Sequence, residues 1–168
     1  MKKVILLLLF TCVSHPTFSQ KDTISTKTIK GTVNKMIEII SGPIDEPRDW
    51  DEFRNLFLPN ATTFLVNPKA KHPASKARSL TLEEFVRYIG PSYKKDGFKE
   101  VEIGLTINEF NNIANVFQAY YAENLKGTYK IKGINSFQLV KIDDRWWIAS
   151  LTWDDETENK KIASIFLN

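Results

Sequence analysis

The chain has 168 residues, and its 23 Lys and Arg against 20 Asp and Glu give a formal net charge of +3. This length suits one domain with its own core, and the nearly balanced charge gives no electrostatic case for binding nucleic acid. The single cysteine, Cys12, lies close to the N-terminus. Beyond it the chain offers no disulfide, thiol nucleophile or cysteine ligand, and we expect neither a metal nor a cofactor.

The first 19 residues are typical of a secretion signal. Lys2-Lys3 form its basic end, residues 4–10 its apolar core, and residues 17–19 a small-x-small cleavage site. The alternative is a retained membrane anchor, but the apolar run is shorter than the ~20 residues that span a bilayer. Cys12 is a poor lipoprotein site because large residues precede it. We expect cleavage near Ser19–Gln20 and a periplasmic or secreted protein without membrane contact.

After the signal, a polar leader at 20–30 precedes one domain at 31–156 and a tail at 157–168. Apolar residues recur at helical spacing over 28–41, so a helix is predicted there. The tail ends in a short apolar run that we expect to dock on the domain.

Further elements follow before the second half of the domain. Asp49 is the expected N-cap of a short second helix that ends at Leu58-Pro59-Asn60, and residues 61–66 then form a strand. A loop at 67–79 leads to a third helix, which begins with a capping box from Thr81. Gly90-Pro91 should break or kink this helix, because proline lacks the N–H that a helix needs.

Residues 98–156 predict four antiparallel strands, because they are rich in β-branched and aromatic residues. Asn111-Asn112, Lys126-Gly127 and Asp143-Asp144 separate them and favour tight turns. If each turn has two residues, alternate side chains share a face, and one face is mostly apolar. The predicted class is α+β, with three N-terminal helices on a strongly curved mixed or antiparallel sheet and a C-terminal four-stranded meander.

This order of elements resembles the nuclear transport factor 2-like superfamily, including its SnoaL-like branch. The most specific part is the last hairpin, where Asp143-Asp144 separates NSFQLVKI from RWWIASLTWDDE. The resemblance covers nearly all of the chain after the signal, and the helical part matches by order and length. It implies a cystatin-like cone, with a curved sheet around three helices and a pocket at the wide end. Some members are enzymes, such as ketosteroid isomerase and scytalone dehydratase, while many others only bind ligands or scaffold partners.

Several polar side chains are expected on the apolar face of the sheet. A buried polar group without a partner costs roughly 1–3 kcal/mol, so these groups must meet each other, water or a ligand. We interpret them as the lining of a wet pocket; the alternative is strand ends that reach solvent, which suits Thr152 in particular. Tyr93 either lines the mouth of the cone or packs in the core. The candidate ligand-binding residues are Gln118, Tyr120, Asn135, Ser150, Thr152 and Tyr93.

Two side chains are candidates for acid–base chemistry. Asp154 is the only carboxylate that two-residue turns place on the pocket face of the sheet, and the imidazole of His72 is a type of group that titrates near pH 6.5. The alternatives are a solvated strand end for Asp154 and an exposed loop position for His72. The paired histidines of a scytalone dehydratase-like site have no counterpart here.

The opposite face carries aromatic side chains among Lys and Arg, which suggests an interaction surface. The alternative is that long basic side chains cover the rings. We expect a homodimer through Phe117, Tyr121, Ile134, Trp147, Leu151 and Trp153.

We therefore expect a secreted or periplasmic module that binds a small, partly apolar molecule. One alternative is a lyase, isomerase or cyclase without a metal, which uses Asp154 or His72 as base and Tyr120 as hydrogen-bond donor. The other is a dimeric scaffold without a ligand. An acid or imidazole with a shifted pKa deep in the pocket favours catalysis, and a pocket with only amides and hydroxyls favours binding.

Overall fold

The computed structural model describes residues 25–66, 71 and 77–167. The expected signal, the first part of the leader and His72 lie outside these residues. No described helix is long and apolar enough to cross a membrane. The elements, in chain order, are η1 (Ser25–Lys27), α1 (Ile29–Ile40), α2 (Trp50–Arg54), β1 (Phe57–Val66), β2 (Ala77–Leu80), α3 (Leu82–Asp96), β3 (Lys99–Phe110), β4 (Ile113–Glu123), β5 (Lys130–Ile142), β6 (Arg145–Asp155) and η3 (Ser164–Phe166).

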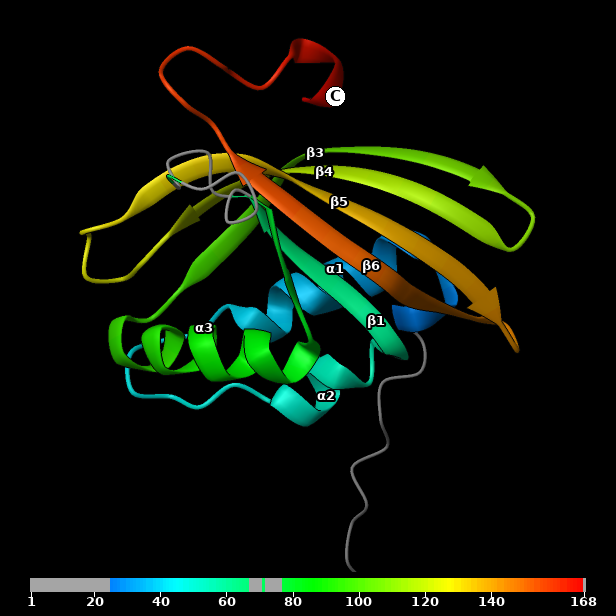
Figure 1. The fold of residues 1–168 in the computed structure, drawn as a ribbon, viewed down its shortest axis with the longest axis horizontal. Coiled ribbons are helices and arrows are strands. Elements are labelled where there is room, and N and C mark those ends of the chain that lie inside the picture. Colours follow the sequence, from blue (N-terminus) through cyan, green and yellow to red (C-terminus); the bar gives the residue numbers. More distant parts are fainter. Residues whose placement is uncertain (1–24, 67–70, 72–76, 168) are drawn as a thin grey trace, which may run out of the picture.

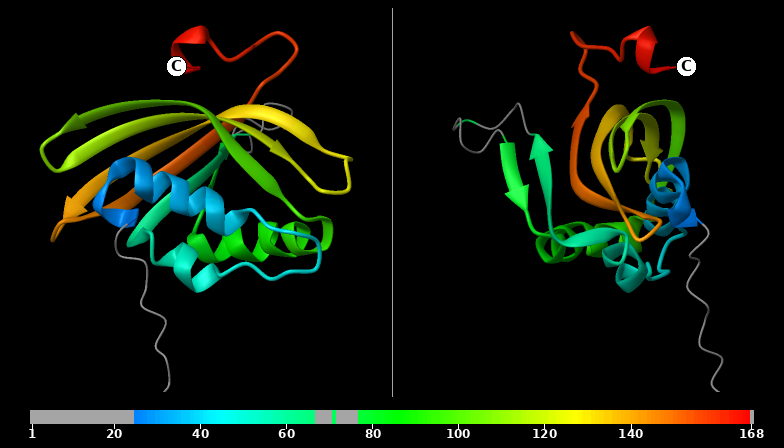
Figure 2. Two further views of the ribbon diagram at one scale, coloured as in Figure 1. Left: turned by 180° about the vertical axis from the view of Figure 1, so that it is seen from behind. Right: turned by 90° about the vertical axis from the view of Figure 1, so that its right-hand side faces the viewer.

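The six strands form one sheet in the order β2-β1-β6-β5-β4-β3. β1 runs parallel to β6, and the other neighbouring pairs are antiparallel. The sheet curves over α1, and α2 and α3 lie on the same side of it (Figure 1, Figure 2). The α+β class and the four-stranded meander are confirmed.

The turns of the meander set its register as the sequence predicts. Phe110 pairs with Ile113 across the first turn, and Ile142 pairs with Arg145 across the last. The middle connection is a wider loop at 124–129, but its flanking strands keep the register that a two-residue turn at Lys126-Gly127 implies.

α3 begins with the capping box that the sequence predicts, and α1 has an N-cap of its own. Thr28 Oγ1 accepts a hydrogen bond from the Gly31 N–H at 3.0 Å, and Thr81 and Glu84 form the reciprocal capping box. The helix is not broken at Gly90-Pro91, because α3 runs as one element from Leu82 to Asp96.

Packing holds the last turns of α3 together. Gly90 lies against the indole of Trp50, which would stand 3.3 Å from a Cβ at this position. The Lys94 carbonyl accepts from the Asp45 N–H at 2.7 Å. These contacts from the rest of the fold offset the hydrogen bond that Pro91 cannot make.

Two boundaries in the first half differ from the expectation. α2 ends at Arg54, and β1 begins at Phe57, earlier than expected. The pairing of β1 with β6 is irregular between Phe57 and Thr62, so Pro59 fits there without a missing ladder bond. β2 begins inside the expected loop at 67–79 and ends at Leu80. It pairs with the end of β1, a contact between strands that local sequence does not reveal.

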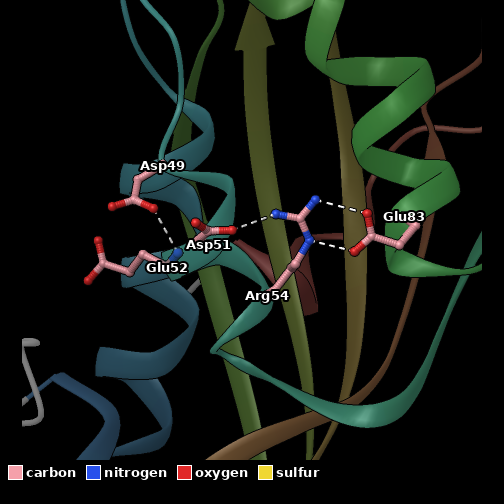
Figure 3. Close-up of polar contacts among 5 residues, drawn as sticks. All are labelled: Asp49, Asp51, Glu52, Arg54 and Glu83. Atoms are coloured by element: carbon pink, nitrogen blue, oxygen red, sulfur yellow. Dashed lines mark hydrogen bonds and ion pairs between the residues drawn. The ribbon is translucent and has the colours of Figure 1, made fainter.

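An ion pair joins α2 to α3. Arg54 donates from Nε and Nη2 to the two carboxylate oxygens of Glu83 at 2.5 and 2.9 Å, and from Nη1 to Asp51 at 3.0 Å (Figure 3). Asp49 caps α2, as predicted, by accepting from the Glu52 N–H at 2.8 Å (Figure 3). These contacts hold α2 and α3 together where they close one side of the cavity described below.

The C-terminal tail docks on the outer face of the sheet, away from the helices (Figure 1). Phe166 packs on Phe117 of β4, with 5.3 Å between ring centroids. The Phe166 carbonyl oxygen lies only 2.0 Å from the place that a Cβ on Gly104 would occupy. The tail therefore reaches this position on β3 because residue 104 has no side chain.

We expect Gly104→Ala to displace the tail, because the new methyl group would overlap the Phe166 carbonyl. Hydrogen exchange should become faster in residues 162–167, while α1 should keep its protection. Gly127→Ala is a control for local backbone strain alone, because its φ of 72° disfavours a side chain while no atom lies within 4 Å of a Cβ built there. Unchanged exchange of the tail in Gly104→Ala would show that the tail is not held at this glycine.

Candidate functional site

A cavity of about 380 Å³ lies between the concave face of the sheet and the three helices. This volume is at the lower end of the ~300–1,000 Å³ that small-molecule sites occupy. Apolar and aromatic side chains such as Phe53, Phe85 and Trp153 form much of its wall. The hydrogen-bonding side chains that line it include Tyr93, Glu100, Tyr120, Tyr129, Asn135 and Asp155.

One row of three residues crosses strands β4, β5 and β6 at this cavity. Tyr120 pairs with Gly133, and Gly133 pairs with Asp155. Because Gly133 has no side chain, the Tyr120 ring passes over it; a Cβ there would stand 2.3 Å from the Tyr120 hydroxyl oxygen. The Tyr120 hydroxyl thereby donates to Asp155 Oδ1 at 2.6 Å. The glycine thus lets a tyrosine and a carboxylate meet across an intervening strand.

A second polar group joins β3, β4 and β5 through the amide of Asn135. Asn135 Nδ2 donates to Glu100 Oε1 at 2.9 Å and to Gln118 Oε1 at 2.7 Å. All three side chains are buried, and Glu100 is only 8% exposed. Gln118 Nε2 has no acceptor among the described residues. The group therefore holds one spare donor inside the protein.

Burial raises the pKa of both carboxyl groups in the cavity. For Glu100 the pKa rises from 4.5 to about 7, because burial and the nearby Asp155 outweigh the hydrogen bond from Asn135. Burial also raises the pKa of Asp155, with a further contribution from Asp154, against the hydrogen bond from Tyr120. Glu100 can therefore gain or lose a proton near neutral pH.

The tyrosines of the cavity keep their protons at neutral pH. Burial raises the pKa of Tyr129 to about 12 and lifts the pKa values of Tyr93 and Tyr120 well above their usual range. Their hydroxyl groups are therefore available as hydrogen-bond donors, and Tyr120 already uses its own for Asp155.

The structure brings together four of the side chains that the sequence singled out. Tyr93, Tyr120 and Asn135 line the cavity, and Gln118 lies behind them, bonded to Asn135. The predicted inward face of β4 and β5 is thus correct. His72 lies outside the described residues.

The second half of β6 faces the other way from the expectation. The pairing of β5 with β6 shifts between Gln138 and Leu139, so that one extra residue, Ala149, enters β6. A bulge of this kind exchanges the two faces of every residue beyond it. Asp155 therefore lines the cavity, while Asp154 is exposed. Asp154 borders a second hollow, the groove under the tail, which lies between the outer face of the sheet and residues 160–166.

The same bulge changes the expected positions of four other residues. Ser150 and Thr152 leave the cavity face, and Thr152 also borders the groove under the tail. Leu151 and Trp153, which were expected in an outer dimer surface, line the cavity instead. The face assignment from the sequence is therefore wrong for β6 beyond Ala149.

A second bulge explains why the sequence did not point to Glu100. The pairing of β3 with β4 shifts between Glu102 and Gly104, which leaves Ile103 as the extra residue. Glu100 then turns inward and Val101 becomes 36% exposed, whereas strict alternation from the turn at Asn111-Asn112 places Val101 on the inner face. Gly104 is the one signal that was available, because a glycine inside a strand often marks a bulge.

Within the described residues, no group of three His, Cys, Asp or Glu side chains is placed to hold a metal ion. The chemistry that the cavity itself offers is hydrogen bonding at the Asn135 amide oxygen and from the tyrosines, and proton exchange at Glu100.

Comparison with known proteins identifies the fold. No family model matches the sequence, and no curated protein matches it. A protein from Novosphingobium aromaticivorans, provisionally named as a scytalone dehydratase, has a TM-score of 0.60 at 13% identity, over 82% of this chain and 87% of that chain. A nuclear transport factor 2-like superfamily protein from Salmonella enterica has a TM-score of 0.59 at 14% identity, over 80% and 93% of the two chains.

A third structure, of a protein of unknown function with a cystatin-like fold from Nostoc punctiforme, has a TM-score of 0.56 at 9% identity, over 76% and 87% of the two chains. At these identities the likeness concerns the fold alone. The chain therefore has the nuclear transport factor 2-like fold that its sequence predicts.

Proposed function

We propose that this protein binds a small, largely apolar molecule in the cavity of the cone. The observation that carries the proposal is the cavity itself, which combines an apolar wall with a few convergent polar groups. This combination is the usual design of small-molecule sites, in which the wall supplies affinity and the polar groups fix orientation. Asn135 and Glu100 would orient the ligand from the sheet, and Tyr93 from α3.

We also propose, from the sequence, that the protein is exported and forms a homodimer through the outer face of the sheet. Of the six residues expected in that interface, Leu151 and Trp153 line the cavity and Ile134 borders the groove under the tail. The Arg145 guanidinium lies 3.8 Å from the centre of the Trp147 ring, as the alternative of basic side chains over the rings expects. The docked tail already contacts Phe117. A dimer would therefore form beside the tail or after its displacement.

Binding is tested by measuring the melting temperature with a panel of small apolar alcohols, ketones, acids and amines. A ligand of the folded state at 100 times its Kd stabilises it by about 2.7 kcal/mol, so at least one class should raise the melting temperature clearly. Ser92→Trp should abolish the effect, because Ser92 lines the cavity from α3. Lys95→Trp on the same helix is the control, because Lys95 is exposed and does not line the cavity. An effect that survives Ser92→Trp would place binding elsewhere.

A second candidate function is proton transfer on the bound molecule, and the pKa of Glu100 near 7 favours it. A general acid or base works best when its pKa lies near the working pH. Ligands found in the panel can be incubated with the protein in D2O. Deuterium uptake at a carbon atom that is lost in Glu100→Gln would support catalysis, and binding without uptake would support a binding protein.

A further inference from the structure

The charged groups of the cavity are all acidic. Among the described residues that line it, Glu100 and Asp155 are carboxylic acids, and none is Lys, Arg or His. A buried carboxylate without a counter-ion is costly, so such groups are normally paired. The cavity therefore holds two acidic groups and, among the described residues that line it, no cation to pair with them.

The two acids differ in how far their carboxylate oxygens are hydrogen-bonded. Tyr120 donates to Asp155 Oδ1, and a tyrosine hydroxyl donating to this oxygen favours the ionised carboxylate. Glu100 is 8% exposed, and one of its oxygens accepts from Asn135. Within the described part of the chain, no hydrogen bond or ion pair reaches its other oxygen, Oε2. This nearly buried acid thus has an unused acceptor at the cavity.

The basic side chains near the cavity are engaged elsewhere. The Arg48 guanidinium donates to backbone carbonyl oxygens at the end of α1, in the loop after it and in α3. Lys30 pairs with Glu102 at 3.6 Å, and Lys126 pairs with Asp96 at 2.9 Å. These cations serve the fold, so none of the three is available to Glu100 and Asp155, and a cationic ligand would supply a counter-charge that the described residues lack.

Aromatic rings complete this environment. Tyr93 and Phe98 stack with 4.0 Å between centroids at the wall, and Tyr120, Tyr129 and Trp153 also face the cavity. The face of an aromatic ring attracts a cation, most strongly where water is excluded. Acidic groups together with rings favour an organic ammonium ion over a neutral or anionic polar group.

We propose that the ligand of this cavity is a small organic amine, whose ammonium group lies between Glu100 and Asp155 and whose apolar part lies against the aromatic wall. The inference rests on the proposed binding function and adds the chemical class of the ligand. The cavity volume of about 380 Å³ suits an amine with an apolar body better than a bare cation.

The test compares three molecules with one carbon skeleton: cyclohexylmethylamine, cyclohexylmethanol and cyclohexanecarboxylate. At pH 7.5 the amine should bind at least ten times more tightly than the alcohol, and the carboxylate should not bind measurably. In Glu100→Gln combined with Asp155→Asn, the amine-to-alcohol ratio of affinities should fall to near one. Glu109→Gln is the matched control, because Glu109 is exposed at the far end of β3, and it should leave the ratio unchanged.

Calorimetry in buffers of different ionisation enthalpy gives an independent measurement. In the folded protein without ligand, the pKa of Glu100 is about 7, so this side chain is partly protonated at pH 7. An ammonium ion that pairs with its carboxylate should therefore release a fraction of a proton from Glu100 on binding. The alcohol should release none. The other titratable groups that face Glu100 are Asp155, Tyr93, Tyr120 and Tyr129, and the tyrosines keep their protons at this pH.

Each outcome decides a different question. If the alcohol or the carboxylate binds as well as the amine, the charge of the ligand is not recognised and this inference is wrong, while the binding function stands. The same holds if only neutral members of the wider panel raise the melting temperature. If no compound of any class binds, the proposed binding function fails together with the inference.

Discussion

Replacing Glu100 by Gln should make the ligand-free protein more stable at pH 8, by about 3 kcal/mol. The reason is that the pKa of Glu100 is about 7 in the folded protein against 4.5 ordinarily, and each pKa unit corresponds to ~1.4 kcal/mol. The folded state therefore binds this proton more tightly than the unfolded state. Below pH 4.5 both states carry the proton, and as the pH rises from there to about 7 the free energy of unfolding falls.

Urea unfolding of both proteins between pH 4.5 and pH 8 checks this prediction. The curves should coincide near pH 4.5 and diverge as the pH rises, because glutamine resembles the protonated acid and can still accept from Asn135. Asp155 also has a raised pKa, so in both proteins it lowers stability as the pH rises, and its repulsion of ionised Glu100 is part of the divergence. Glu109→Gln, at an exposed position, should not reproduce the divergence. A constant difference at all pH values would mean that Glu100 does not titrate near neutrality.

Replacing Phe53 by Ala should cost about 3–5 kcal/mol of stability, the usual range for a buried phenylalanine. Phe53 is 0% exposed, and its ring stacks on Phe85 with 5.3 Å between centroids and 9° between planes. Phe57 and Trp50 pack against the same ring at 4.9 and 5.5 Å. One side chain thus joins α2 to α3 and to the start of β1.

The matched control is Phe110→Ala at the tip of the first hairpin. Phe110 is 71% exposed, so its loss should change the free energy of unfolding by about 0.5 kcal/mol or less. Phe53→Leu keeps most of the volume and should lie between the two. Urea unfolding measures all three, and a loss below 1 kcal/mol in Phe53→Ala would show that the helices are not held together through this ring.

Much of the meander is determined by the sequence alone. Alternating apolar residues and the turn residues at Asn111-Asn112 and Asp143-Asp144 set both the strands and their register, because these signals are local. The caps at Thr28 and Thr81 are local in the same sense, since each satisfies N–H groups only a few residues away. For the same reason the inward direction of Gln118, Tyr120 and Asn135 was predictable, because no bulge lies between these residues and the turn that joins β4 to β5.

The other half of the site was decided by the tertiary structure. The extra residues Ile103 and Ala149 turn Glu100 and Asp155 inward, and neither residue type marks a bulge by itself. Bulges increase the local twist and bend of a strand. The sheet bends here because it has to close over three helices, a requirement that belongs to the packing of the whole domain.

The same division applies to the elements that were misjudged. The sequence determined that Pro91 lacks a donor, but contacts from Trp50 and Asp45 decided that the helix continues through it. Residues 67–79 were expected to form a loop, and pairing with β1 decided that residues 77–80 form a strand. Periodicity, turns and caps arise from neighbours in the chain, whereas bulges, added edge strands and the contents of the cavity arise from neighbours in space.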